Sequence, residues 1–490
     1  MPRWPSALGM ADRDPAFETA TTDRTTTEGP VRRSTISSGR MALLFTVMLV
    51  TAAGNTAMQS VMPSIGTALQ VDDVWISLAY SWSALLWVVC APIWARRSDR
   101  RGRKAMMALG LVGFILSMAL CGLVLWAGLA GWITAFVALI AFAAARSLYG
   151  GFGSAAPPAV QAYVASRTPR VERTKALSLI ASSFGLGTVI GPALAPLMVL
   201  PFTGLGLTGP FLCFALIGLV ALIVLRLKLP NDEPQFAARS RTFDAPYASG
   251  SGGAPADHRA SYDDGGEDDD DDDGVPVEGS TAADPREVAN LRWFEPRLRP
   301  WVIAGLLGGH AQAMILGISG FLVLDRLALR DTPELGAGPV GIVLMFGALA
   351  TLLAQWGLIP RFDLGPRMAT LSGALIAAIG ILILGAAGDL HTITLGYAIA
   401  SLGFGLFRPG TTAGTSLAVS RAEQGQASGI VASVAGASFI YAPALGVWLY
   451  NISDWLGFGL AIALCLSVIA VGWRMLASDR EMTGTAPPRN

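Results

Sequence analysis

The sequence predicts an all-α membrane protein with twelve transmembrane helices in two pseudo-symmetric six-helix bundles. Three observations lead to this prediction: the composition, the number of long apolar stretches, and a repeat between the two halves of the chain. Of the 490 residues 52% are hydrophobic and only 14% are charged, and the mean hydropathy is +0.52. A soluble globular chain of this size carries far more charge, so most of the surface must face lipid.

Twelve apolar stretches are long enough to cross a bilayer, which needs about 20 residues in helical conformation. The fourth is longer than one span requires, so we expect its C-terminal part to tilt or to project from the membrane. The stretches cover residues 41–68, 74–95, 104–127, 132–165, 174–200, 207–228, 301–324, 337–359, 368–387, 393–418, 427–450 and 455–476.

Two short segments of the fifth stretch recur in the eleventh. KALSLIAS at 175–182 aligns with QASGIVAS at 426–433, and GPALAP at 191–196 aligns with APALGV at 442–447 at the same offset of 251 residues. A duplicated six-helix unit explains this offset. Parallel repeats are a known plan of transporters, in which the substrate site lies between the repeats near the middle of the membrane.

The spans define an N-terminal half, 41–228, and a C-terminal half, 299–477. Residues 1–40 are rich in Thr, Ser, Pro and Arg without a signal-peptide pattern, and we expect a disordered cytoplasmic tail there, with a second short tail at 478–490. Residues 229–298 contain 17 of the 35 acidic residues, including an unbroken acidic run at 267–273. Repulsion within this run predicts an extended, flexible cytoplasmic linker, and its spacing does not fit a calcium loop.

Basic residues in the short loops predict the orientation, because Lys and Arg accumulate on the cytoplasmic side. The loops after the second and fourth stretches are strongly basic, and the loops after stretches one, three, five, nine and eleven contain no Lys or Arg. Only Arg326 and Arg330 oppose this pattern. Both termini and the linker are therefore expected in the cytoplasm.

Several classes of function find no support in the sequence. The four cysteines stand singly in apolar stretches without metal-ligand spacing, and no phosphate-binding G-x-x-x-x-G-K-[ST] loop is present. We find no nucleophile with a base and no cluster of metal ligands. We therefore predict no catalytic residue, no cofactor, no metal and no nucleic-acid partner, although a receptor or membrane enzyme remains an alternative class.

The loop between the second and third stretches reads RSDRRGRK at 97–104. A basic anchor with a glycine turn is one interpretation. The loop also resembles the D-R-x-G-R-[KR] signature of the major facilitator superfamily, although Ala95 and Arg97 depart from the family pattern. The resemblance implies a conformational lock in which the acid approaches the start of the eleventh span near Gln426. The matching residues are Asp99, Arg100, Gly102, Arg103 and Lys104; a reduced copy lies at 361–367.

An arginine lies deep in the fourth stretch, within RSLYGGFGSAA at 146–156. Such a residue is costly to bury and is a functional candidate, unless it reaches the membrane interface. Arg146, Gly150 and Gly153 resemble the family's R-x-x-x-G-x-x-[GA] pattern, whose arginine is implicated in proton coupling. Tyr149 stands where the family often has Gln.

The fifth stretch contains GLGTVIGPALAP at 185–196. The spacing of Gly187 and Gly191 favours close helix packing, and Pro192 is expected to kink the helix. The segment also resembles the G-x-x-x-G-P signature of the family's exporters, without its final glycines. This resemblance implies export, whereas a packing role alone also fits.

Polar residues deep in other spans are candidates for a substrate cavity or for contacts between helices. Besides Tyr149, these are Asn55, Gln59, Gln312 and Arg408. No acid lies in the middle of a predicted span, so proton coupling needs another group. We favour Asp325 at the outer end of the seventh span as the proton carrier. Two alternatives are His310 in the same span and a proton that the substrate itself carries. In a third, Asp325 only forms an ion pair at the membrane interface.

The resemblance covers residues 41–476 and is nearest to the twelve-span drug:proton antiporters of the tetracycline-efflux type. It implies proton-coupled export of a small amphipathic or drug-like molecule by alternating access across a bacterial cytoplasmic membrane. The expected partners are this molecule, protons and the lipid bilayer, and the protein is expected to work as a monomer. Export of a self-made metabolite or siderophore and proton-coupled import are the alternatives.

Overall fold

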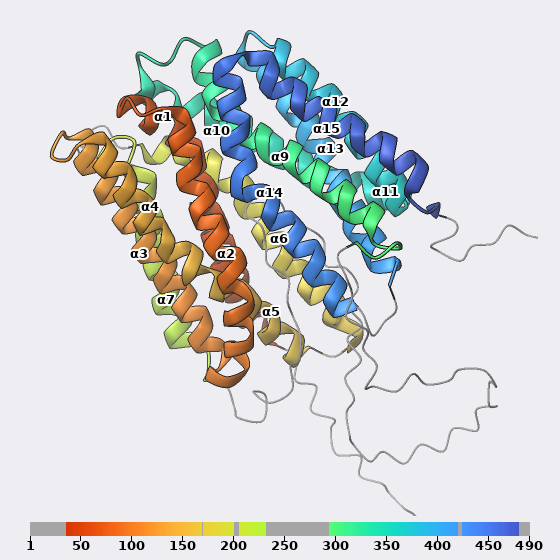
Figure 1. Cartoon of the computed structure of the whole chain (residues 1–490). Coiled ribbons are helices and arrows are strands. Elements are labelled where there is room, and N and C mark those ends of the chain that lie inside the picture. Colours follow the sequence, from red (N-terminus) through yellow and green to blue (C-terminus); the bar gives the residue numbers. More distant parts are fainter. Residues whose placement is uncertain (1–35, 169, 200–204, 232–293, 420–423, 480–490) are drawn as a thin grey trace, which may run out of the picture. The chain divides into compact units, whose positions relative to one another are not determined.

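The computed structural model describes residues 36–168, 170–199, 205–231, 294–419 and 424–479. This part of the chain is built from α-helices with short 3₁₀ and π segments, and it contains twelve helical spans that are long and apolar enough to cross a membrane. The prediction of a twelve-span, all-α membrane protein is confirmed (Figure 1). Most of the expected linker and N-terminal tail lies outside the described residues.

Six spans form the first half, coloured from red to yellow-green in Figure 1. Its helices are α1 (Ser38–Ala68), α2 (Asp73–Arg101), α3 (Arg103–Leu129), α4 (Ala135–Gly151), α5 (Ala156–Arg167), α6 (Arg170–Leu194) and α7 (Gly209–Lys228). The second half, coloured from green to blue, comprises α9 (Arg299–Arg326), α10 (Ala337–Leu352), α11 (Ile359–Phe362), α12 (Pro366–Ala386), α13 (Leu390–Leu417), α14 (Gln424–Ile452) and α15 (Asp454–Met475).

The long fourth span is interrupted. A 3₁₀ turn, Gly153–Ala155, separates α4 from α5, and the two prolines that follow occupy the first turn of α5, where their missing N–H groups cost nothing. The eighth span contains a π segment, Leu353–Leu358, between α10 and α11. The apolar pattern does not predict this second irregularity.

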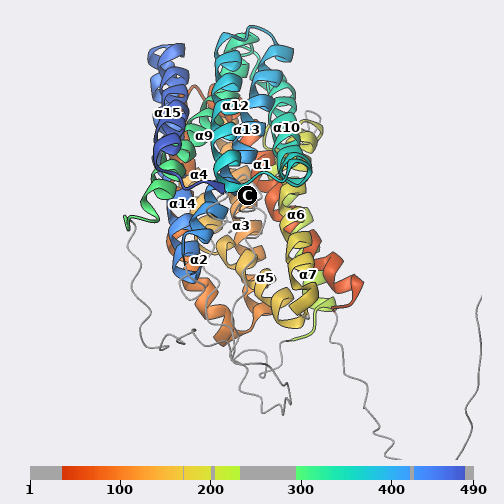
Figure 2. The same ribbon diagram turned by 90° about the vertical axis from the view of Figure 1, so that its right-hand side faces the viewer.

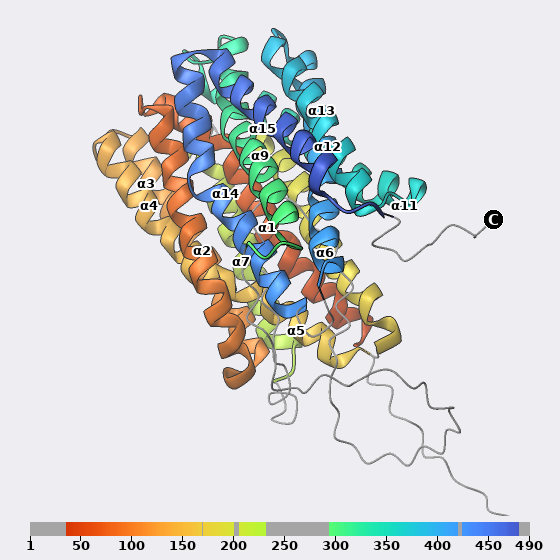
Figure 3. The same ribbon diagram turned by 45° about the vertical axis from the view of Figure 1, so that its right-hand side comes forward.

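The two halves repeat the same packing plan. In the first half α6 packs along α1, and in the second half α14 packs along α9, as Figure 3 shows for the second pair. Each of these repeated helices also contacts the other half: α6 contacts α10 and α14 contacts α2 (Figure 2). Pro192 in α6 and Pro443 in α14 are equivalent in the sequence repeat, and both interrupt the hydrogen bonding of their helices. The sequence repeat therefore corresponds to a structural one.

Two glycines of α6 allow its backbone to lie directly on α1. A side-chain carbon at Gly187 would stand 2.6 Å from the Leu49 carbonyl oxygen, and one at Gly191 would overlap the Ala53 carbonyl oxygen and the Thr56 hydroxyl. The Thr56 hydroxyl donates a hydrogen bond of 3.3 Å to the carbonyl oxygen of Gly187. The expected close packing at these two positions is thus present, as in other membrane helix pairs with small residues at the contact.

We predict that Gly191→Ala lowers the stability of the purified protein by about 1–3 kcal/mol, because the added methyl group meets backbone atoms that cannot turn away. Thermal unfolding in detergent measures the effect. Gly459→Ala in α15 is the control, since nothing lies within 4 Å of a side-chain carbon there. Equal unfolding temperatures for the two variants would contradict the close fit of α6 on α1.

Candidate transport site

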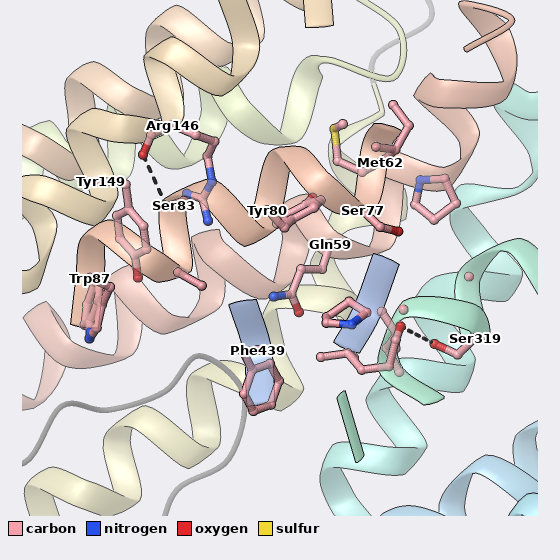
Figure 4. A pocket seen from close by; sticks show the side chains of 18 of the residues that line it. Gln59, Met62, Ser77, Tyr80, Ser83, Trp87, Arg146, Tyr149, Ser319 and Phe439 are labelled. Carbon is pink, nitrogen blue, oxygen red and sulfur yellow. Dashed lines mark hydrogen bonds between the residues drawn. The ribbon is translucent and has the colours of Figure 1, made fainter. Parts of the chain in front are cut away.

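A central cavity lies between the two halves (Figure 4). Helices α1, α2, α4 and α6 line it from the first half, and α9, α10 and α14 line it from the second. The space between its lining atoms is about 1170 Å³, including volume open to solvent. Its walls are largely apolar and aromatic, and they include Met62, Tyr80, Trp87, Tyr149, Phe184 and Phe439.

A second pocket of about 660 Å³ adjoins the central cavity and shares four lining residues with it. The shared residues are Gln59, Leu316, Leu344 and Phe439. This second pocket adds polar groups from both halves, including Thr188, Gln312 and Thr351. Together the two pockets form a mostly apolar chamber with a few hydrogen-bonding groups, which is the usual character of a small-molecule site.

Arg146 is the one charged side chain among the described residues that line either pocket. Its side chain is 3% exposed, and its Nη2 donates a hydrogen bond of 2.7 Å to Oδ1 of Asn55. The guanidinium carbon lies 4.6 Å from the ring centre of Tyr149 and 5.7 Å from that of Tyr80. Two aromatic faces and one amide therefore surround this charge, and Nε and Nη1 have no hydrogen-bond partner among the described residues.

The glycines after Arg146 explain how the arginine reaches the cavity. A side-chain carbon at Gly150 would clash with the carbonyl oxygen of Ser83 in α2, so only glycine permits this approach of α4 to α2. The Ser83 hydroxyl in turn donates a hydrogen bond to the carbonyl oxygen of Arg146 (Figure 4). At Gly153 the ring of Tyr149 occupies the space that a side chain would need. Both glycines thus position the Arg146–Tyr149 pair.

One end of the cavity is closed by contacts between the halves. We name it the Asp73 end, because α2 begins there at Asp73. Arg330, in the segment after α9, donates two hydrogen bonds of 2.9 and 2.8 Å to Asp73 and one of 2.6 Å to Asp325. It also donates to the Thr67 hydroxyl in α1. About one helical turn before Thr67 and Asp325, Pro63 of α1 packs against Gly320 of α9, and both line the cavity.

Asp325, a candidate for proton coupling, belongs to this cluster. Besides the bond from Arg330, its carboxylate accepts a hydrogen bond of 2.8 Å from the Tyr450 hydroxyl of α14. The neighbouring Arg326 pairs with Asp454 at 2.7 Å instead. The two basic residues that oppose the charge pattern of the loops are therefore both paired with carboxylates.

His310, the other candidate, lies on α9 but is not among the residues that line either pocket. Its Nδ1 is 2.6 Å from the carbonyl oxygen of Leu306 and 3.3 Å from the Ser438 hydroxyl. Its ring stands 5.0 Å from that of Tyr441, which is 52% exposed. These contacts direct His310 toward α14.

The polar residues predicted for the cavity occupy different positions. Gln59, Tyr149 and Gln312 line the pockets, whereas Asn55 binds Arg146 and is buried. Arg408 lies in α13 and is not among the lining residues.

The residues of the predicted conformational lock are only partly described. Asp99 and Arg100 lie in the last turns of α2, but their side chains and that of Gln426 lie outside the described residues. Gly102 has a φ of +88°, which favours glycine at the turn between α2 and α3. Arg103 is buried, and Lys104 donates a hydrogen bond of 3.0 Å to the carbonyl oxygen of Arg226 in α7.

Sequence reasoning missed Asp73 and the aromatic residues of α2. Asp73 stands at the start of a span, where an acid commonly stabilises the positive end of the helix dipole, so nothing marked it as a contact to the other half. Tyr80 and Trp87 lie seven residues apart, a spacing that places both on one face of α2. That spacing was a signal for a common surface. Among the described residues no group of His, Cys, Asp or Glu could hold a metal ion.

Two repeated six-helix halves around a central cavity are the architecture of a membrane transporter. The chain belongs to the Major Facilitator Superfamily, whose family model matches residues 44–362.

Relatives in this family include multidrug resistance proteins. Multidrug resistance protein 2 of Bacillus subtilis is 23% identical over 432 residues, which cover 86% of this chain and 91% of that protein. A multi-drug resistance efflux pump PmrA homolog of Lactococcus lactis is 31% identical over 163 residues, 33% of this chain and 36% of that protein. A probable actinorhodin transporter of Streptomyces coelicolor is 29% identical over 180 residues, 36% of this chain and 28% of that protein.

Solved structures share the fold at low sequence identity. A bacterial homolog of the human lysosomal transporter Spinster, in an inward-facing and unoccupied conformation, has a TM-score of 0.62 and 13% identity, covering 94% of this chain and 100% of that chain. The xylose transporter XylE from E. coli, in an inward-open conformation, has a TM-score of 0.61 and 16% identity over 92% and 99% of the two chains. These likenesses confirm the fold.

We predict that Asn55→Leu lowers the stability of the protein by about 1–3 kcal/mol, because it leaves another buried N–H group of Arg146 without an acceptor. Asn55→Asp is the matched variant, since it keeps an oxygen at the same place. Thermal unfolding in detergent distinguishes the two. A leucine variant as stable as the wild type would mean that the bond to Asn55 does not hold Arg146.

Proposed function

We propose that this protein exports a small amphipathic or drug-like molecule across the cytoplasmic membrane of a bacterium in exchange for protons. The observation that supports this function most strongly is the central cavity, whose aromatic and apolar walls come from both halves. Such walls suit a molecule with a substantial apolar body. The names of the multidrug-resistance relatives point in the same direction.

The position of the cavity between the halves supports transport by alternating access. The distribution of basic loop residues favours an orientation in which the Asp73 end faces the outside. The Arg330–Asp73 pair would then close the cavity to the exterior, and the halves must separate there before a substrate can leave. Breaking this pair is therefore a required step of export.

Proton coupling through Asp325 fits the cluster at the Asp73 end. A proton on Asp325 removes one of the two negative charges that hold Arg330, which weakens the contact between the halves. Water outside the cell can reach this carboxylate, whose side chain is 33% exposed. His310 is less suitable because its side chain contacts Leu306 on its own helix and Ser438 and Tyr441 on α14, and none of these contacts involves Arg330.

The resemblance of Gly187, Gly191 and Pro192 to the exporters' signature supports the outward direction. A second candidate function is the export of a metabolite that the cell itself makes, which the similarity to a probable actinorhodin transporter favours. A strain that lacks the protein distinguishes the two. Increased sensitivity to added compounds supports drug export, and retention of a product inside the cell supports metabolite export.

We predict that wild-type protein in liposomes accumulates at least one of ethidium, fluorescein or 2-naphthoate when the lumen is acidic relative to the medium. Protein-free liposomes are the control. Asp325→Asn should abolish this uphill accumulation because the carboxylate can no longer take up a proton, whereas His310→Gln should retain it.

Downhill exchange of the same probe, measured without a pH gradient, shows whether each variant remains folded and competent. Uphill accumulation by Asp325→Asn would remove that residue from proton coupling. Failure of the folded wild type to move any of the three probes against a gradient would argue against proton-coupled export of amphipathic molecules.

A further inference from the structure

The central cavity carries an uncompensated positive charge. Arg146 is its only charged lining residue in the described chain, and the adjoining pocket contributes none. The hydrogen bond to Asn55 is with a neutral amide, and no described carboxylate pairs with Arg146. Asp73 and Asp325, the acids near the closed end, are both held by Arg330. Arg146 is therefore the one formal charge on the described walls of the cavity, and it is positive.

A charge in this environment is costly unless a partner meets it. The faces of Tyr80 and Tyr149 offset part of the cost through the negative centres of their rings. The buried Nε and Nη1 atoms still lack acceptors among the described residues. Guanidinium groups bind planar anions such as carboxylates through two parallel N–H groups, which neither a phenol ring nor an amide replaces.

We propose that the cavity binds amphipathic organic anions, with the carboxylate or related acidic group at Arg146 and an aromatic body against Tyr80, Trp87 and Phe439. This inference rests on the proposed function and adds the chemical class of the substrate. Figure 4 shows Arg146 directed between Tyr149 and Tyr80 toward the space beside Gln59, with Phe439 on the opposite side. An anion with a flat apolar body can meet both features at once.

The walls fit the apolar part of such a molecule. Trp87 packs on Tyr149 with ring centres 5.2 Å apart, which forms a continuous aromatic surface next to the guanidinium. Ser77 and Gln59 supply hydrogen-bonding groups farther along the cavity. A cationic molecule of the same size would bring its charge toward Arg146 without a carboxylate to compensate, and the low polarity of the walls strengthens the repulsion.

Binding of three matched probes to the purified full-length protein in detergent tests this proposal without any transport step. The probes are 2-naphthoate, 2-naphthamide and 2-naphthylmethylammonium, which share one ring system and differ in charge. Isothermal titration should give a dissociation constant for naphthoate that is lower than that of the amide by about tenfold or more, as a hydrogen bond between charged groups predicts. The ammonium probe should bind most weakly.

Variants then assign the preference to Arg146. Arg146→Met should reduce the preference for naphthoate over the amide to about twofold or less, and Arg146→Lys should retain part of it because the charge remains. Phe439→Ala, a change in the wall, should weaken naphthoate and the amide by similar factors. Thermal unfolding of each variant shows that it is folded, and the comparison of the three probes on wild-type protein does not depend on any variant.

Three results would overturn the proposal: no saturable binding of naphthoate to folded wild-type protein, equal or tighter binding of the amide or the ammonium probe, or an unchanged preference in folded Arg146→Met. These results are separate from the transport test of the proposed function. A protein that accumulates ethidium uphill and prefers the ammonium probe would remain a proton-coupled exporter, with a cavity for cations and not for anions.

Discussion

The contact on which the closed end of the cavity depends is the bidentate pairing of Arg330 with Asp73, because it joins the two halves there. Two carboxylates from different halves hold a single guanidinium, and Asp73 is almost fully buried. Such a pair gains little stability over apolar packing, but breaking it by removing one partner leaves a buried charge without compensation. It therefore fixes which end of the cavity is closed more than it stabilises the fold.

The cost of burying a charge applies equally to Arg146 in the central cavity, but its partners differ. Arg330 has carboxylates as partners, whereas Arg146 has an amide and two aromatic rings. The first arrangement is complete without a ligand, and the second gains an ion pair only when an anion enters. Arginine thus has two different roles in this protein. Arg330 joins the halves and Arg146 lines the cavity, and the difference lies in the groups that surround each guanidinium.

This difference also bears on the proposed anion site and on the proposed proton coupling. A weak acid bound to Arg146 as its anion has already released its proton, and a substrate that left with a proton would carry it outward, against the proposed exchange. The substrate-borne proton that the sequence left open therefore does not fit an anionic ligand at Arg146 in such an exchange. Coupling through Asp325 does not need it. The transport of Asp325→Asn and the charge preference of the cavity bear on these two routes separately.

The sequence predicted the twelve spans because apolar length decides whether a segment crosses lipid, and the first span, Ser38–Ala68, differs from its prediction by three residues at one end. The sequence also identified Arg146 as a functional candidate, because an arginine that deep in an apolar span is costly to bury. The π segment at Leu353–Leu358 was not predictable, since the eighth span is apolar almost throughout and has no periodic pattern that an extra residue in a turn would interrupt.

The sequence also did not predict contacts between residues that are far apart in the chain. Asp73 and Arg330 are separated by 257 positions, and neither residue indicates the other. Asn55 and Gln59 lie one turn apart on α1, yet Gln59 lines the cavity while Asn55 is covered by Arg146. Which of two residues on one helix face reaches a cavity depends on the side chains of the neighbouring helices, and the sequence of one helix does not contain that information.

The most direct test of the account is the distance between the halves at the Asp73 end. Spin labels at Asp72 and Leu335, which are exposed and belong to different halves, report it by pulsed electron paramagnetic resonance in liposomes. We predict a dominant short distance for the otherwise wild-type protein and a shift of the population to longer distances in Arg330→Gln. The same distance distribution with and without Arg330 would contradict the claim that its pairing with Asp73 holds this end closed.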